Sequence, residues 1–353
     1  MCSIPLPRQW TPAVSLVMPC RNESSNIARA VSSLLVQDYP GPIELIVVDG
    51  QSCDQTLATI ASLSSYNTRV TVRVIRNPAL TTSIGLNLGI AAARGEVIFT
   101  LGAHTQYSSD YVSGAVATMR REDCDAVGSR ASTLPGGSSR MAKAIALALS
   151  CPFGVGNSRM RTTAASSSQT LADTASCPAY RRRVFERIGL FNPHLERNQD
   201  IEFNLRLRDA GMTLVLDPRI VSHYRARATL GQLAANCFGN GFWVARSLRF
   251  CGRAFSARHL APLFFLVGTI AMLVFTAALP TPGAARWLPL AIATGIYLLA
   301  GTASLLITHW GNALPETLLV FPVMHYSYGF GSLWGLLTIW RPLPNPLSCS
   351  SST

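Results

Sequence analysis

The sequence predicts an α/β domain with a mostly parallel sheet and helices on both of its faces, followed by C-terminal transmembrane helices. Short apolar runs alternate with helix-like segments through the first hundred residues, which is typical of such a sheet. Long uncharged stretches follow residue 260. Only 14% of the 353 residues are charged and 48% are hydrophobic. This composition excludes a disordered chain and disfavours a purely soluble protein.

The first hundred residues predict four buried strands with helices between them. The strands are expected at 14–19, 44–50, 70–75 and 96–102. The helices are expected at 27–35, 54–63 and 83–95. In a sheet of this kind, ligands bind at the carboxyl ends of the strands, where Asp49 and the segment 102–104 fall.

The middle of the chain is less regular. Residues 141–150 are expected to form a short helix that lies on the membrane or packs inside, and 162–170 a polar loop. A helix over 199–210, stopped by Gly211, carries Asp200 in its first turn. Glu202 and Arg206 are spaced i,i+4 on it and are expected to form a surface pair.

Two stretches, 260–280 and 288–308, each hold about 20 uncharged residues, which is enough to cross a bilayer. A third stretch, 318–340, is interrupted by Pro322 and His325, and either spans the membrane or is re-entrant. The alternative for all three is a buried helical domain. The predicted organisation comprises five segments, namely an N-terminal extension, a cytoplasmic domain, a basic juxtamembrane segment, a membrane region and a tail: 1–12, 13–250, 251–259, 260–340 and 341–353.

Charge and cysteine usage indicate the compartment. Residues 218–353 carry nine arginines and a single acid, Glu316. Four arginines precede the first span, and by the positive-inside rule they place the α/β domain in the cytoplasm. They are also candidates to bind anionic lipid headgroups, whereas nucleic acid is the weaker interpretation. These residues are Arg246, Arg249, Arg253 and Arg258. Nine cysteines without a Cys-x-x-Cys pair favour reduced thiols. The segment 1–12 lacks the apolar core of a signal peptide.

Two strand ends carry candidate binding residues. Asp49 is suited to accept hydrogen bonds from a nucleobase or ribose, although a turn acid that caps the next helix would look the same. An acid–x–His pair at a strand end suits Mg²⁺ or Mn²⁺. Here that position reads Gly102-Ala103-His104, and a lone histidine is more often structural.

Two later segments carry further candidates. Asp200 is either a general base or an acid stabilised by the helix dipole. His223 is a candidate metal ligand after a strand. Arg225 and Arg227 are suited to bind phosphate oxygens, or else they decorate a membrane surface.

The order of these signals resembles the family 2 inverting glycosyltransferases with a GT-A fold, and more narrowly the succinoglycan-biosynthesis-type membrane glycosyltransferases. The resemblance covers residues 14–250. The matching blocks are VSLVMPCRNE, VVDGQSCDQT, GLNLGIAAARGEVIFTLGAH, CPFGVGNSRMR, DTASCPAYRRRVFERIGLF, NQDIEFNLRLRDAG and LDPRIVSHYRARATLGQL.

The resemblance implies a GT-A nucleotide-sugar-binding domain that uses a UDP-linked donor and Mn²⁺ or Mg²⁺. The sugar would pass in a single displacement to a polyprenyl-diphosphate-linked glycan at the inner leaflet of a bacterial inner membrane, in exopolysaccharide or cell-surface glycan assembly. Asp200 would be the base and His104 and His223 the metal ligands. The implied donor-binding residues are Pro19, Arg21, Glu23 and Asp49, joined by Arg225.

Two departures from the family pattern matter. Gly102 stands where the family has the metal-binding aspartate, which favours a second hypothesis, a catalytically degenerate protein with a binding or scaffolding role. In the block expected near the acceptor, Gly241 and Trp243 are kept. A dinucleotide-binding oxidoreductase is set aside because no Gly-x-Gly-x-x-Gly follows the first strand. A transporter is set aside because it would leave the α/β domain without a role.

Overall fold

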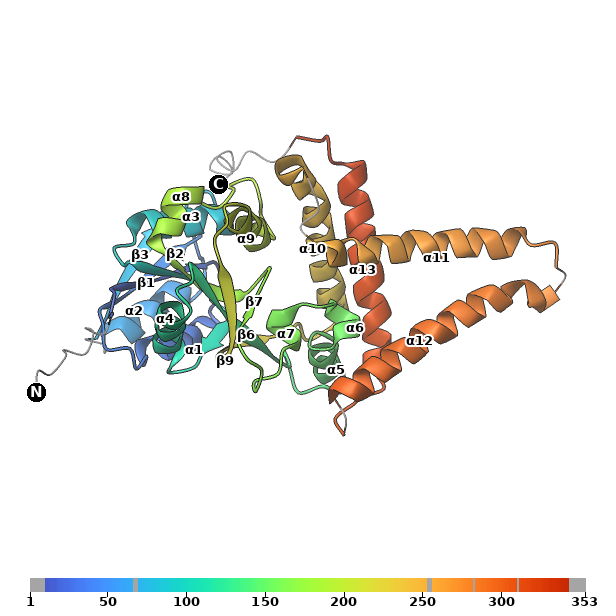
Figure 1. The fold of residues 1–353 in the computed structure, drawn as a ribbon, viewed down its shortest axis with the longest axis horizontal. Helices are drawn as coiled ribbons and strands as arrows, with labels where there is room; N and C mark the ends of the chain where they lie inside the picture. The colour runs from blue at the N-terminus through green and yellow to red at the C-terminus, as the bar shows by residue number, and fades with distance from the viewer. Residues whose placement is uncertain (1–9, 66–68, 253–255, 282, 310, 343–353) are drawn as a thin grey trace, which may run out of the picture.

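The computed structural model describes residues 10–65, 69–252, 256–281, 283–309 and 311–342. A sheet domain stands on one side of the molecule, and a pair of long helices, α10 (Leu230–Cys251) and α13 (Thr317–Leu337), runs beside it (Figure 1). Two further helices project away from this pair as a hairpin. Most of the predicted extension 1–12 and of the tail 341–353, together with Arg253, lies outside the described residues.

The first half of the sheet is parallel, as predicted. Its strands run in the order β3-β2-β1-β4. They are β1 (Val14–Cys20), β2 (Ile43–Asp49), β3 (Val70–Arg76) and β4 (Val97–Thr100). The carboxyl ends of β1 and β2 are level, because Cys20 pairs with Asp49 in the register.

The second half of the sheet is mixed, so the expectation of a mostly parallel sheet holds only for the first half. Its strands are β5 (Thr105–Tyr107), β6 (Ala126–Leu134), β7 (Thr170–Leu171), β8 (Ser176–Arg181) and β9 (Leu214–Arg225). β8 is antiparallel to both β4 and β6, whereas β6 and β9 are parallel. β5 pairs antiparallel with β9 and so joins the segment after residue 102 to the strand that carries His223.

Helices cover both faces of the sheet because alternate strand residues point to opposite sides. Leu16 and Met18 of β1 belong to one core cluster, and Val17 belongs to the other. The first cluster is closed by α1 (Ile27–Leu35), α2 (Thr56–Ser65) and α4 (Tyr111–Arg121). The second is closed by α3 (Thr82–Ala92), α8 (Arg182–Ile188) and α9 (Gln199–Asp209).

The pair α10–α13 is packed through small residues. A Cβ atom on Gly241 would lie 2.1 Å from the carbonyl oxygen of Tyr328, and one on Gly331 would lie 2.0 Å from that of Phe238. Helix pairs in membranes commonly use glycine to let their backbones approach this closely. Helix α10, which the predicted boundary at 250 assigns to the sheet domain, packs along α13.

Residues 141–150 pack inside this helical unit, which is one of the two positions expected for them. Helix α5 (Arg140–Ala148) buries Ala144, Ile145 and Ala148 in a cluster with Phe321 of α13. Two short helices follow, α6 (Pro152–Val155) and α7 (Arg159–Thr162).

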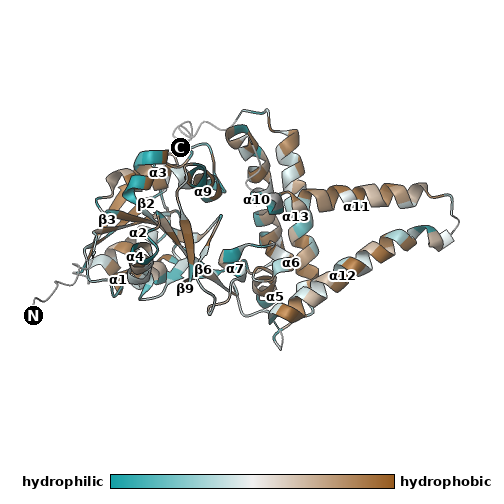
Figure 2. Cartoon of the chain, in the orientation of Figure 1, coloured by the Kyte–Doolittle hydropathy of each residue, from teal (hydrophilic) through white to brown (hydrophobic). Residues whose placement is uncertain are grey.

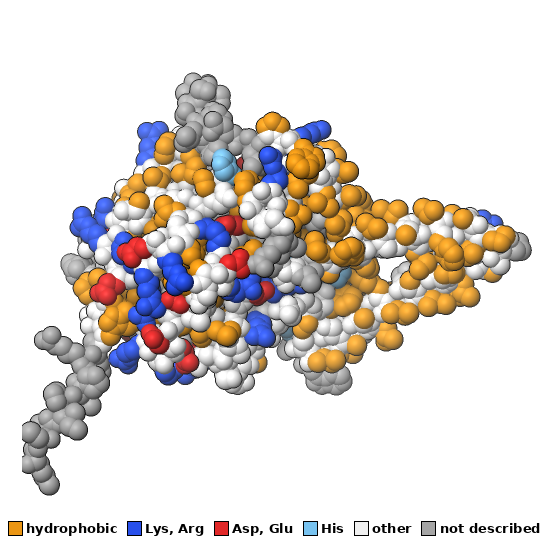
Figure 3. Space-filling model, turned by 45° about the horizontal axis from the view of Figure 1, so that its top comes forward, with side chains coloured by type: hydrophobic (Ala, Val, Ile, Leu, Met, Phe, Trp, Pro, Cys, Tyr) orange, Lys and Arg blue, Asp and Glu red, His pale blue; other side chains and the backbone are white. Residues whose placement is uncertain are grey.

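The projecting hairpin consists of α11 (Ala261–Ala278) and α12 (Leu288–His309), joined through a 3-10 turn. Both helices are long and apolar enough to cross a membrane by length and composition, and little of either is buried. Figure 2 shows the two helices as mostly hydrophobic, and Figure 3 shows the hairpin covered with apolar side chains while the charged ones gather on the sheet domain. Most of the third stretch, 318–340, forms one helix, α13, which ends at Leu337 and continues without a break through Pro322.

Three of the four arginines before the hairpin have protein partners. Arg246 is buried and donates to the carbonyl oxygens of Thr338 and Arg341 at 3.0 and 2.8 Å. Arg258 forms an ion pair with Asp173 at 2.9 Å. Arg249 donates to the carbonyl oxygen of Arg341 at 3.0 Å and stays exposed.

The predicted surface pair on α9 is not on the surface. Glu202 is buried, and its carboxylate accepts from Arg206 Nε at 2.6 Å and Nη2 at 3.0 Å. Arg206 also donates to the carbonyl oxygens of Ile188 and Leu190. The pair therefore ties α9 to the turn after α8, and the i,i+4 spacing alone did not indicate this because the spacing is the same on either face of a helix.

The seven cysteines in the described ranges are free thiols, as predicted.

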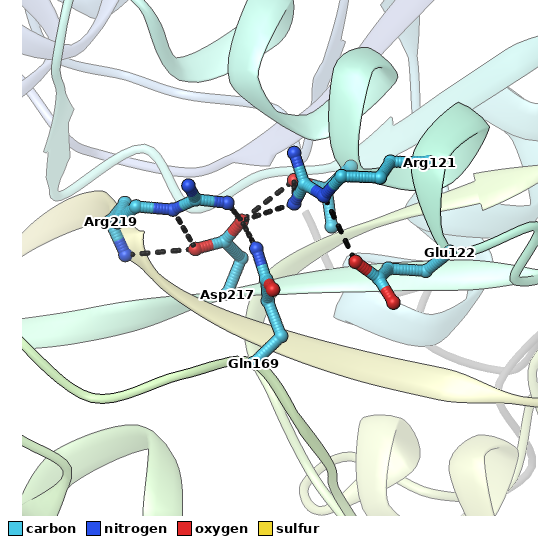
Figure 4. A network of polar contacts seen from close by, with 6 residues as sticks. Arg121, Glu122, Gln169, Asp217 and Arg219 are labelled. Atoms are coloured by element: carbon cyan, nitrogen blue, oxygen red, sulfur yellow. Dashed lines mark hydrogen bonds and ion pairs between the residues drawn. The ribbon is translucent and has the colours of Figure 1, made fainter.

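A second buried acid, Asp217, holds β9 in place (Figure 4). Its side chain is 1% exposed and accepts hydrogen bonds from Thr118, Gln169 and Arg219 at 2.7, 2.8 and 2.7 Å. Arg121 lies 3.4 Å away. The network joins α4, the loop before β7 and the middle of β9, and so anchors the strand whose far end carries His223 and Arg225.

Candidate functional site

The loops after β1 and β2 are joined side by side at the carboxyl edge of the sheet. The backbone N–H of Asn22 donates to Ser52 Oγ at 2.9 Å, and that of Glu23 donates to Thr56 Oγ1 at 2.8 Å. Gly50 N–H donates to the carbonyl oxygen of Cys20 at 2.8 Å. These bonds satisfy the backbone groups where the two strands end and make a single wall from two loops.

Asp49 lies in this wall at the end of β2 and is 5% exposed. Its two carboxylate oxygens lie 3.2 and 3.3 Å from the N–H of Ser52, so the turn-capping role is filled. Pro19 is the second-last residue of β1, and Arg21 is exposed against Gly50. The structure therefore brings Pro19, Arg21 and Asp49 together at the ends of β1 and β2.

The segment 102–104 is fixed by Tyr107. Its hydroxyl accepts from the N–H of Gly102 at 2.8 Å and donates to the carbonyl oxygen of the same residue at 3.0 Å. His104 Nδ1 then lies 3.6 Å from Glu23 Oε1. Burial alone would raise the pKa of the Glu23 carboxyl, but hydrogen bonds from His104 and Asn26 outweigh burial and hold that pKa below its usual value. Glu23 is therefore an ionised partner of the histidine.

His223 faces the same small cavity as His104. The cavity measures about 10 Å³ and is also lined by Arg29 and Arg225. The Nδ1 atom of His223 is buried and has no hydrogen-bond partner among the described residues. Burial and the nearby positive charge of Arg130 lower the pKa of His223, so its imidazole is neutral near pH 7.

These residues do not fit a divalent cation. A cavity of about 10 Å³ is at the lower limit for one water molecule, so a hydrated ion has no room in it. Two guanidinium groups share its wall, and Gly102 supplies no carboxylate. Within the described ranges, no three His, Cys, Asp or Glu side chains are grouped so that they could hold a metal ion. Mg²⁺ is usually bound through one or two carboxylates, and no carboxylate lines this cavity.

Beside the small cavity lies a larger polar one of about 720 Å³. Its wall contains His104, four arginines and no acid. The arginines are Arg29, Arg197, Arg225 and Arg227. They come from α1, the loop before α9 and the end of β9, so the basic wall is assembled from three distant parts of the chain.

Asp200 lines a different cavity, of about 520 Å³, between the sheet domain and the helical unit. It lies in the first turn of α9. Burial raises the pKa of the Asp200 carboxyl and outweighs the hydrogen bonds from the backbone N–H groups at the helix start. A raised carboxyl pKa brings the group closer to the range in which a general base works best.

The two large cavities adjoin each other. Arg227 and Asn236 line both of them. Tyr224 stands between the histidine side and the Asp200 side, since its ring centroid is 5.9 Å from that of His104 and 4.9 Å from the guanidinium carbon of Arg161. A molecule bound in one cavity therefore meets a molecule bound in the other beside Arg227.

The cavity that contains Asp200 is apolar at its far end. There it is lined by Phe153, Phe265, Tyr297 and Met324 from α6, α11, α12 and α13. Three arginines, Arg161, Arg227 and Arg258, line it as well. The arrangement suits a ligand with a long apolar part and an anionic group.

Gly241 and Trp243, the residues expected on the acceptor side, are not among the residues that line these cavities. Gly241 contacts α13, and Trp243 is buried among the helices. Helix α10 reaches the apolar cavity through residues nearer its start, among them Asn236 and Asn240.

Sequence reasoning missed several residues of the site. Arg29, Arg161, Arg197 and Asn236 were not singled out. Each is a common residue type in an ordinary helix or loop, and only the tertiary structure places the four around the two cavities.

Comparison with known proteins identifies the class of protein that this site resembles. Residues 15–189 match the family described as Glycosyl transferase family 2. The succinoglycan biosynthesis protein ExoA of Rhizobium meliloti is 26% identical over 330 residues, which cover 93% of this chain and 88% of that protein. A protein of Methanococcus voltae is 26% identical over 272 residues, covering 74% and 81% of the two chains; it is named dolichyl N-acetyl-alpha-D-glucosaminyl phosphate 3-beta-D-2,3-diacetamido-2,3-dideoxy-beta-D-glucuronosyltransferase.

Among solved structures, the mannosyltransferase PcManGT from Pyrobaculum calidifontis, in complex with GDP-Man and Mn²⁺, has a similar fold. The likeness covers 93% of this chain and 88% of that chain, with a TM-score of 0.62 and 18% identity. At this identity the likeness concerns the fold alone, and it agrees with the predicted GT-A domain followed by apolar helices.

Proposed function

Since the chain belongs to glycosyl transferase family 2, we propose that it transfers a sugar from a nucleotide-sugar donor to a lipid-linked saccharide at a membrane. The observation that carries this proposal is the pair of adjoining cavities, one basic and one apolar, with Asp200 in the second. The names of two relatives support it, because one gives a dolichyl-phosphate-linked sugar and the other succinoglycan biosynthesis. The process served would be exopolysaccharide or cell-surface glycan assembly.

The donor would bind along the carboxyl edge of the parallel strands, where α/β sheets bind their ligands. Pro19, Arg21 and Asp49 would contact the nucleoside, because the two loops that carry them form one wall. The diphosphate would lie in the basic cavity beside His104 and Arg225. A UDP-linked sugar is the donor that we expect.

The acceptor would bind in the cavity between the sheet domain and the helices. A polyprenyl chain is apolar and would pack against Phe153, Phe265 and Met324, which leads it toward the hairpin. Arg161 and Arg258 would meet the phosphate groups that join the polyprenyl chain to the saccharide. The saccharide would then lie near Asp200, at the junction with the donor cavity.

The reaction would be a single displacement. Asp200 takes the proton of the acceptor hydroxyl, the hydroxyl oxygen forms a bond to the anomeric carbon, and the bond from that carbon to the diphosphate oxygen breaks. Its electron pair leaves with the nucleoside diphosphate. Positioning of the two substrates in adjoining cavities supplies part of the rate enhancement, because it makes their encounter intramolecular.

The hairpin of α11 and α12 would anchor the protein in the bacterial inner membrane. The arginines near the start of the hairpin would keep the sheet domain on the cytoplasmic side. An acceptor in the inner leaflet could then enter the apolar cavity from the side of α11 and α12, whose residues Phe265 and Tyr297 line it.

The test is release of nucleoside diphosphate by the full-length protein in detergent, given a panel of nucleotide sugars and a bacterial polyprenyl-lipid extract. We expect release with one donor and a loss of 100-fold or more in Asp200→Asn, as general-base contributions run to about 10²–10⁴. The matched control is Asp209→Asn at the exposed end of the same helix, which should keep its activity. Equal activity of Asp200→Asn and the control would refute the role of Asp200.

The rival hypothesis, a degenerate protein with a binding or scaffolding role, has one observation in its favour, the glycine at position 102. It predicts that the protein binds a nucleotide or lipid without releasing product from any donor. The same assay therefore separates the two functions.

A further inference from the structure

The geometry points to an arginine-held donor: four guanidinium groups, those of Arg29, Arg197, Arg225 and Arg227, bind the diphosphate in place of a divalent cation, so that binding and turnover need no metal. The inference rests on the proposed function for the identity of the donor. It concerns how this chain neutralises the diphosphate, and it explains why the chain functions with Gly102 where a metal-binding carboxylate would otherwise stand.

The small cavity between His104 and His223 lacks suitable ligands for a cation. Glu23 lies beside His104, with its Oε1 3.6 Å from His104 Nδ1, and already accepts a hydrogen bond from Asn26. His223 meets His104 only across a cavity of about 10 Å³. A cation placed there would lie beside Arg29 and Arg225, and Coulomb repulsion from two guanidinium groups opposes its binding.

The basic cavity carries enough positive charge to neutralise a diphosphate. Its wall carries four formal positive charges and no carboxylate, in a volume of about 720 Å³. The diphosphate of a nucleotide sugar carries about two negative charges, and a third develops when the sugar leaves. The four arginines therefore supply enough charge to neutralise both the bound donor and the departing nucleoside diphosphate without help from an ion.

The arginines of the basic cavity have hydrogen-bond donors that are not used within the protein. Within the described residues, the side chains of Arg225 and Arg227 make no hydrogen bond or ion pair of their own, and both are exposed to the cavity. Arg197 makes one long hydrogen bond, at 3.4 Å to Asn240 Oδ1. A guanidinium group presents a planar fork of donors that matches phosphate oxygens in pairs.

The chemical consequence concerns the departing group. As the bond between the anomeric carbon and the diphosphate oxygen breaks, negative charge grows on that oxygen. Arg227 lines both cavities and thus stands where the two substrates meet, so its guanidinium is placed to receive this charge. Donors of this kind, fixed in advance, contribute on the order of 10²–10³-fold each to a rate.

The experiment measures binding of UDP and GDP to the full-length detergent-purified protein by titration calorimetry, in EDTA and in Mn²⁺. We expect one of the two to bind with an affinity that differs less than threefold between the two conditions. Arg225→Ala and Arg227→Ala should each weaken binding about tenfold or more in EDTA. The matched control is Arg120→Ala, an exposed arginine of α4 outside these cavities, which should bind like the parent protein.

A second variant installs the missing carboxylate. A Cβ on Gly102 would lie 3.2 Å from Thr105 Oγ1 and 3.9 Å from the His104 ring, so Gly102→Asp fits after a small shift and points toward the histidine. Its charge should repel the diphosphate and weaken binding in EDTA, and Mn²⁺ should restore that binding. Dependence on Mn²⁺ would thus appear in the variant and not in the parent.

Three outcomes overturn the inference: binding by the parent protein that is lost in EDTA and restored by Mn²⁺, arginine variants that bind like Arg120→Ala, or no binding of either nucleotide under any condition. Failure of the proposed function looks different. In that case the parent binds nucleotide in EDTA through Arg225 and Arg227, as inferred, but releases no product from any donor and lipid extract.

Discussion

The buried carboxylate of Asp217 offers a quantitative test of how the sheet domain is held together. Its side chain is 1% exposed and accepts from six donor atoms, which belong to four residues. The change Asp217→Asn keeps the shape of the side chain and so leaves no cavity. It removes the charge and turns an NH₂ group toward donors, among them the buried hydroxyl of Thr118.

The expected loss of stability in Asp217→Asn depends on how exposed the hydrogen-bond donors around the side chain are. Hydrogen bonds to a charged group contribute about 1.5–3 kcal/mol, and a buried group left without its partner costs about 1–3 kcal/mol. Arg121 and Arg219 are about half exposed, so water solvates them once the charge has gone, and their ion pairs add little. We therefore expect a loss of about 3 kcal/mol in the free energy of unfolding, or a fall of roughly 6–12 °C in Tm.

The assay is thermal unfolding of the detergent-solubilised protein followed by tryptophan fluorescence. The matched control is Asp123→Asn, whose side chain is 89% exposed and pairs with Arg181 at 3.3 Å; its Tm should change by less than about 2 °C. A fall in Tm that is equal in the two variants would refute the reasoning.

The pH dependence gives an independent check. Burial would raise the pKa of Asp217, but hydrogen bonds from Arg219, Gln169 and Thr118 outweigh burial and hold that pKa below its usual value. A depressed carboxyl pKa contributes stability above the unfolded pKa, about 3.9, and that contribution is lost as the pH falls through the folded pKa. The difference in Tm between the parent and Asp217→Asn should therefore shrink below about pH 4. A constant difference from pH 7 to pH 3 would contradict this assignment.

Three further predictions follow from particular contacts. Because burial raises the pKa of Asp200, the acid limb of the pH–rate profile should lie above the reference pKa of an aspartate, about 3.9. Steady-state kinetics across pH would refute this if the limb lay at or below that reference value. Gly241→Leu should separate α10 from α13 and lower Tm by more than 5 °C, whereas Gly231→Leu, which faces open space on the same helix, should be neutral in the same melting assay. Arginines at Ile270 and Ile296, exposed on α11 and α12, should each cost about 2.5–3.5 kcal/mol of insertion and reduce the share of protein that resists carbonate extraction; an unchanged share would argue against insertion of the hairpin.

Much of the fold was predictable because its signals are local. The apolar runs ending at Cys20, Asp49 and Thr100 became parallel strands, since a strand buried on both faces must be apolar throughout. The two uncharged stretches after residue 260 became the helices of the hairpin, because their length and composition are enough to indicate them. The helix that begins near Asp200 was marked by its acidic first turn and by Gly211 at its end.

Other features depended on contacts between distant segments. The i,i+4 pair of Glu202 and Arg206 gave no sign that α8 and its turn would bury it. The antiparallel return of β8 between β4 and β6 is likewise absent from the local pattern, because β8 reads as a strand in either direction. The partners of Arg246 and Arg258, a carbonyl oxygen and Asp173, are likewise absent from the local charge pattern.

The sequence by itself determined the class of this protein: an α/β sheet with Asp49 at a strand end, an apolar hairpin, and Gly102 in place of a metal-binding carboxylate. Each of these is carried by the residues of a single segment. Only the tertiary structure decided that Arg29, Arg197, Arg225 and Arg227 line one cavity and that Asp200 opens onto a second, adjoining one. The physical reason is that a cavity is made by side chains from elements far apart in the chain, and their meeting depends on packing that no local pattern encodes.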